Sequence, residues 1–115
     1  MNPDIKRQWV DALRSGDYRQ GRQLLRFGDE FCCLGVLSDL ATKANVGIDV
    51  ETLEDGTYRF DFFESLLPPS IRDWAGLDSR NPRVTVSDGH NRALSDLNDE
   101  GITFAEIADL IDEHL

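Results

Sequence analysis

Cysteine and histidine are scarce in this chain, which has two of each among its 115 residues. The cysteines, Cys32 and Cys33, are adjacent, so a disulfide between them would be strained and we expect reduced thiols. No Cys-x-x-Cys spacing is present, and the histidines, His90 and His114, lie far from the cysteines in the sequence. We therefore predict neither a metal site nor a bound cofactor.

Long apolar runs are also missing. No stretch approaches the roughly 20 apolar residues that a membrane-spanning helix needs. The first residues, Met1 to Asp4, lack the basic and apolar regions of a signal peptide. These features predict a cytoplasmic protein that has no membrane partner.

Basic residues are outnumbered by acidic residues. The chain has 12 Lys and Arg residues and 22 Asp and Glu residues, and its formal net charge is -10. Contacts from Lys and Arg to phosphates supply most of the affinity of proteins for nucleic acids, so we expect no direct nucleic-acid binding. The acidity is compatible with a partner that has a basic surface. A simpler interpretation is that it keeps a small protein soluble.

What the chain does contain is the composition of one globular domain, with 40% hydrophobic residues. Asn2 is a typical N-cap before a proline, and it predicts a helix over Pro3–Arg14. The most apolar segment, residues 31–41, predicts a largely buried helix. Gly35 weakens that helix, which is usually tolerated where another element packs closely against it.

The C-terminal segment has the clearest helix signal. Thr103 and Glu106 form a capping box, which predicts a helix from there to the end of the chain. Shorter helices are predicted over residues 69–74 and 93–97.

Strand signals occupy the middle of the chain. Residues 48–63 alternate apolar and polar positions around a turn at residues 54–56, which predicts a β-hairpin. Residues 84–86 predict a third strand, and residues 16–29 predict a loop with a short extended part. The fold class predicted for residues 1–115 is therefore a single α+β domain, in which a small antiparallel sheet packs against three main helices.

Sequence signatures of catalysis or of DNA binding are weak. Ser87, Asp88 and His90 are close neighbours in a polar segment, which is more typical of a turn than of a catalytic triad. Cys33 and His90 would suit a nucleophile and its base, but an apolar helix raises the pKa of a thiol. Residues 94–111 look like the start of a helix-turn-helix, yet no basic recognition helix follows. We therefore predict no catalytic residue.

Charge is distributed unevenly along the chain. Residues 1–26 hold six basic and three acidic residues, whereas the remainder holds six basic and nineteen acidic residues. The planar guanidinium group of arginine suits carboxylates and phosphates. The arginines either pair with the acidic remainder or form an anion or nucleotide site. The candidate binding residues are Arg14, Tyr18, Arg19, Gln20, Arg22 and Arg26.

Six segments form a pattern that extends over most of the chain: Trp9-Val10-Asp11-Ala12-Leu13-Arg14-Ser15-Gly16, Tyr18-x-Gln20-Gly21, Phe31-Cys32-Cys33-Leu34-Gly35-Val36-Leu37, Leu67-Pro68-Pro69, Trp74-Ala75-Gly76-Leu77 and Leu97-Asn98-Asp99-x-Gly101-x-Thr103-Phe104-x-Glu106-Ile107-Ala108. This pattern resembles that of a family of small phage and prophage proteins of unassigned function. In that family a third cysteine often stands at the position of Ser38, and a glycine often stands near Gln23. The resemblance implies a phage setting, inside the bacterial host, and no particular chemistry.

Three functions follow as hypotheses. We expect a non-enzymatic phage accessory protein that inhibits or sequesters a host component, such as a defence protein, by occupying its surface. The alternative is a small-ligand binder that holds a nucleotide-type anion with the arginine-rich segment. A small enzyme that uses Cys33 or the segment from Ser87 to His90 is the third hypothesis.

Overall fold

The computed structural model describes residues 1–115, and its first helix has the predicted bounds. Helix α1 spans Pro3–Arg14. The side chain of Asn2 caps it, because Oδ1 accepts hydrogen bonds from the backbone amides of Asp4 at 2.9 Å and Ile5 at 3.2 Å. These two bonds satisfy amides that have no partner inside the helix.

Helix α2 spans Cys33–Lys43 and is the most buried element of the chain. It starts two residues later than the sequence predicted, because Phe31 lies in a short strand and Cys32 is the N-cap. Gly35 lies where the chain at Leu25 crosses the helix. The predicted close contact is therefore confirmed.

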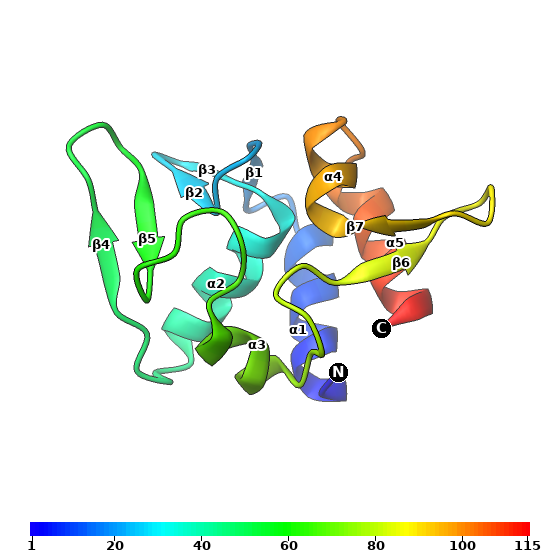
Figure 1. Cartoon of the computed structure of the whole chain (residues 1–115), viewed down its shortest axis with the longest axis horizontal. Helices are drawn as coiled ribbons and strands as arrows, with labels where there is room; N and C mark the ends of the chain where they lie inside the picture. The colour runs from blue at the N-terminus through cyan, green and yellow to red at the C-terminus, as the bar shows by residue number, and fades with distance from the viewer.

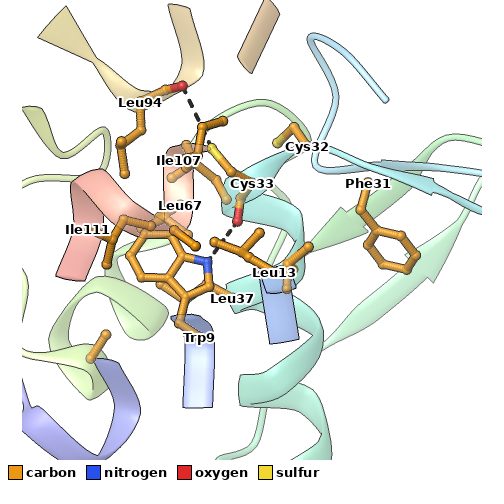
Figure 2. Close-up of a cluster of buried hydrophobic side chains, with 14 of the residues drawn as sticks. Trp9, Leu13, Phe31, Cys32, Cys33, Leu37, Leu67, Leu94, Ile107 and Ile111 are labelled. Carbon is orange, nitrogen blue, oxygen red and sulfur yellow. Dashed lines mark hydrogen bonds between the residues drawn. The ribbon is translucent and has the colours of Figure 1, made fainter. Parts of the chain in front are cut away.

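Three helices form the central layer of the fold. Helix α5 spans Phe104–His114, and α1 lies between α2 and α5 (Figure 1). Trp9 of α1 is fully buried, and its indole N–H donates to the carbonyl oxygen of Cys33 at 3.0 Å (Figure 2). One hydrophobic core thus joins elements from both ends of the sequence.

The strands are two or three residues long and form three separate small sheets. They are β1 (Arg19–Gln20), β2 (Arg26–Phe27), β3 (Glu30–Phe31), β4 (Val50–Thr52), β5 (Tyr58–Phe60), β6 (Arg83–Thr85) and β7 (Asn91–Ala93). The order in the first sheet is β1-β3-β2, where β1 and β3 are parallel. The predicted α+β class is confirmed, but the strands are divided among three small sheets instead of one, and an isolated bridge between Phe27 and Thr57 connects the first sheet to the hairpin of β4 and β5.

Two hairpins extend from opposite ends of the helical layer (Figure 1). Strands β4 and β5 form the predicted hairpin, and β6 forms a second hairpin with β7, which the sequence analysis missed. The two shorter predicted helices are also present as α3 (Pro69–Ala75) and α4 (Leu94–Asp99).

The capping box of α5 differs slightly from the expected one. The hydroxyl of Thr103 accepts from the amide of Glu106 at 3.2 Å, as predicted. The carboxylate of Glu106 accepts from the same hydroxyl at 3.1 Å. None of the helices is long and apolar enough to cross a membrane.

Candidate functional site

The six predicted binding residues do not converge on one cavity. Arg14 reaches from α1 to α5, where its guanidinium lies 2.7 Å from the carboxylate of Asp109. Arg19 and Arg22 are exposed, and Arg22 lines a small groove of about 310 Å³ beside Gln20. For Arg14, the interpretation that the arginines pair with the acidic remainder of the chain is therefore confirmed.

Arg26 lies among aromatic rings at the junction of two sheets. Its guanidinium carbon is 4.0 Å from the centre of the Tyr58 ring and 4.8 Å from that of Phe31. Its Nε–H donates to the carbonyl oxygen of Gly28 at 2.8 Å. These contacts orient the side chain and stabilise the fold through cation–π attraction.

Tyr18 and Arg26 share a groove of about 620 Å³ with a network of charged groups. The Tyr18 hydroxyl donates to Asp39, and the ammonium group of Lys43 lies 2.9 Å from the same carboxylate. Partial burial, and then the hydrogen bond to Asp39, raise the pKa of Tyr18. The hydrogen bond to Asp39 likewise raises the pKa of Lys43. Both groups therefore stay protonated at neutral pH.

Acidic groups outnumber basic groups in this groove. Asp11 and Asp17 line it in addition to Asp39, whereas its cations are Arg26 and Lys43. Because like charges repel at short range, the three carboxylates oppose the binding of an anion there.

Gln20 has a structural position instead of an exposed one. Its amide nitrogen donates to Asn98 Oδ1 at 3.0 Å and to the carbonyl oxygen of Ile102 at 2.8 Å. Its amide oxygen accepts from the backbone of Phe104 at 3.2 Å. Gln20 thereby joins the strand β1 to the turn between α4 and α5.

Asn98 is the centre of this network, and it is fully buried. Its oxygen also accepts from the backbone amide of Cys33 at 3.1 Å, and its nitrogen donates to the carbonyl oxygen of Gly21 at 2.8 Å. The neighbouring carboxylate of Asp99 accepts from the amide of Gln23, whose φ is 68°. The sequence analysis did not identify this role of Asn98 and Asp99.

The two thiols are buried inside the core. Burial raises the pKa of Cys32 to about 11 and raises that of Cys33 well above its usual value. The Cys33 thiol lies 3.7 Å from the carbonyl oxygen of Leu94 (Figure 2). No histidine contacts it, because His90 lies on an exposed loop.

The segment from Ser87 to His90 is the turn of the hairpin of β6 and β7. Asp88 accepts from the backbone amide of His90 at 2.9 Å, and the two side chains pair at 3.0 Å. Both side chains are mostly exposed. The polar segment is therefore a turn, as its composition suggested.

A second tight turn follows strand β5, and the sequence analysis did not find it. Phe60 and Phe63 exchange two backbone hydrogen bonds of 2.8 and 3.0 Å. The two residues between them, Asp61 and Phe62, have φ values of 48° and 74°. Positive φ at both central positions is the geometry of a type I′ turn, in which glycine is strongly preferred at the second position.

Surrounding contacts hold this turn in place. Asp61 exchanges hydrogen bonds with Asp49, each of 2.7 Å, through its amide and its carboxylate. The hydroxyl of Ser70 donates to the same carboxylate. The side chain of Phe62 receives little stabilisation from packing, because 78% of the residue is exposed.

We use the name Phe62 surface for Phe62, Phe63 and Arg80, which line a groove of about 440 Å³. Phe63 is also partly exposed, and the guanidinium of Arg80 lies 4.3 Å from the centre of its ring. Arg80 forms no ion pair, but its Nε–H donates to the carbonyl oxygen of Leu67 at 2.7 Å. The surface therefore combines exposed aromatic area with one cation that has no acidic partner.

Residues 1–115 match the model of the family described as "Domain of unknown function (DUF8296)". The chain belongs to this family. No curated protein and no solved structure matches it.

Proposed function

We propose that this protein works by binding another protein through the Phe62 surface, without catalysis. In the phage setting that the sequence pattern implies, the partner is a component of the bacterial host, which is inhibited when its own surface is occupied in the cytoplasm. The observation that carries this proposal is the exposed aromatic side chain at a backbone conformation that suits glycine.

In the free protein, the backbone conformation of Phe62 costs free energy that burial of its side chain does not recover. A residue other than glycine in the left-handed region costs about 1–2 kcal/mol. Phe62 does not recover this cost by burial, because most of it is exposed. Strained residues of this kind concentrate at functional sites, and exposed aromatic side chains are typical anchors of protein interfaces. A partner that buries the ring supplies the free energy of burial that offsets this conformational cost.

The shape of the surface favours a protein partner over a small molecule. The Phe62 ring projects from a tight turn, and an aromatic side chain at such a position fits a pocket on another protein. Arg80 beside it favours a partner that has a carboxylate at the rim of that pocket.

Capture from infected host cells tests this proposal. The tagged protein should retain one host protein specifically, and Phe62→Gly should lose it. Val46→Ser is the matched control, because Val46 is also an exposed apolar residue outside the turn. Equal retention by the wild type and by Phe62→Gly would contradict the proposal.

A second candidate function is the binding of a nucleotide-type anion in the groove of Tyr18, Arg26 and Lys43. It is favoured by the size of the groove and by its two cations beside an aromatic ring. The three carboxylates there oppose it. Stabilisation by millimolar nucleotides in a thermal shift assay, lost in Arg26→Gln, is the result expected for this function. No shift with any nucleotide would dispose of it.

A further inference from the structure

A fourth groove lies along the C-terminal helix, far from the Phe62 surface. It has a volume of about 270 Å³ and follows α5 beside the hairpin of β6 and β7. Its floor is apolar, and four side chains from four parts of the chain form it: Val86, Leu97, Ile102 and Leu110. All but Leu97 are partly exposed.

The rim of this groove is acidic. Glu106, Asp109 and Glu113 line it, and they are spaced three and four residues apart on the same face of α5 as Leu110. No Lys or Arg lines the groove, and α5 itself contains neither. The side chains of Asp109 and Glu113 are 72% and 74% exposed.

One cation approaches the rim from outside. Arg14 of α1 pairs with Asp109 at 2.7 Å and lies 3.9 Å from Asp112. Glu106 and Glu113 have no Lys or Arg partner, although Glu113 lies 3.8 Å from the ring of His114. Glu106 accepts a hydrogen bond from the Thr103 hydroxyl, but neither its charge nor that of Glu113 is paired with a Lys or Arg of this chain, so both can pair with cations of another molecule.

We propose that this groove binds a basic amphipathic segment of a partner protein. Aliphatic side chains of the segment cover the apolar floor, and its Lys or Arg residues pair with Glu106 and Glu113. Charge complementarity selects this occupant: a nucleic acid would be repelled by the rim, and a purely apolar segment would leave the carboxylates without partners. Part of the acidity that the sequence analysis associated with solubility thus lies at the rim of this groove.

This inference does not depend on the Phe62 surface. The turn after β5 and helix α5, which lines the groove, lie toward opposite sides of the molecule along its long axis (Figure 1). A variant of one surface leaves the other intact. A result that disproves one proposal therefore does not bear on the other.

A titration followed by NMR tests the inference. The probe is a synthetic helical peptide of Leu and Lys with one apolar face, added to the 15N-labelled protein. The control peptide has the same composition, with its Leu residues dispersed around the helix. We expect amide shifts confined to α5, Ile102 and the turn after β6, and binding that weakens as salt rises.

Variants of the groove sharpen the test. Leu110→Asp should weaken the binding of the amphipathic peptide at least about tenfold, and Glu113→Gln should weaken it severalfold. Glu54→Gln, at the exposed turn between β4 and β5, removes the same charge and should have no effect. If the NMR spectrum of Leu110→Asp is not that of a folded protein, Leu110→Ala is used in its place.

Several outcomes would overturn the proposal. They are equal binding of the two peptides, shifts spread over all acidic surfaces, an unchanged affinity in the Leu110 variants, or no shifts at all. Self-association of the protein through this groove, detected by sedimentation and abolished by Leu110→Asp, would show instead that a second copy is the occupant.

Discussion

The carbonyl oxygen of Leu25 lies 1.6 Å from the position that a Cβ atom on Gly35 would occupy. The chain at Leu25 thus crosses α2 in direct contact with its backbone. Two hydrogen bonds fix this crossing segment, since the Leu25 amide donates to Glu64 at 2.7 Å and the Leu25 carbonyl accepts from Cys32 at 3.3 Å. A side chain at residue 35 cannot be accommodated unless the backbone moves.

Gly35→Ala is therefore expected to lower the free energy of unfolding by about 3 kcal/mol or more, because overpacking against backbone cannot be relieved by a side-chain rotation. Urea denaturation measures this loss. Gly89→Ala is the matched control: Gly89 also changes from glycine to alanine, but nothing lies within 4 Å of its added Cβ. That control should cost only about 1 kcal/mol, from its φ of 86°. Equal losses in the two variants would contradict the close contact.

Asn98→Ala should also lower the free energy of unfolding, by about 3 kcal/mol. The substitution leaves the Cys33 amide and the Gly21 carbonyl without their hydrogen-bond partner, and each unsatisfied buried group costs about 1–3 kcal/mol. Asn91→Ala, at an exposed position, serves as the control and should cost less than about 1 kcal/mol. A neutral effect of Asn98→Ala in denaturation would show that the network does not stabilise the fold.

Stability should fall above about pH 9. The thiols of the unfolded chain ionise near this pH, whereas burial raises the pKa of Cys32 in the folded protein to about 11. The folded state then binds more protons than the unfolded state, so the free energy of unfolding decreases by up to about 1.4 kcal/mol per pH unit for each thiol. Burial raises the pKa of Cys33 in the same direction.

Denaturation at several pH values between about 8 and about 11 measures this slope, and Cys32→Ala should reduce it. A disulfide reagent should modify both thiols only after unfolding. Rapid modification of the native protein at neutral pH would contradict the buried placement, and it would favour the hypothesis of a cysteine enzyme.

Local signals in the sequence predicted much of the fold. Asn2 before Pro3, and Thr103 three residues before Glu106, mark helix starts because their side chains bond to the nearest free amides. The structure confirms both helices. Gly35 also predicted a close contact, although the sequence did not show that Leu25 makes it.

Contacts between distant segments could not be predicted in the same way. Asn98 looks like a turn residue, and its burial depends on Gln20 and Cys33, which lie far away in the chain. The turn at Phe62 was missed because Asp-Phe is not a usual pair for type I′ geometry. For the arginine-rich segment the sequence left two possibilities open, pairing with the acidic remainder or one anion site. In the structure, Arg14 at the end of α1 pairs with Asp109, whereas Arg26 of β2 lies over the Tyr58 ring.

Phe62→Gly is expected to raise the free energy of unfolding by about 0.5–1 kcal/mol. Glycine relieves the left-handed strain of about 1–2 kcal/mol, and part of this gain is offset because glycine loses more chain entropy on folding. Denaturation compares this variant with Phe62→Ala, which keeps the strain and should not gain stability. Destabilisation by Phe62→Gly would show that the ring stabilises the fold. It would contradict the proposal that Phe62 carries an uncompensated conformational cost.

The most direct test of the proposed function is the Kd of the captured host protein for the wild type and for Phe62→Gly, measured with purified components. Because an aromatic anchor of an interface contributes about 2 kcal/mol or more, the variant should bind at least about thirtyfold more weakly while it is at least as stable as the wild type. An unchanged Kd in the stable variant would contradict the account.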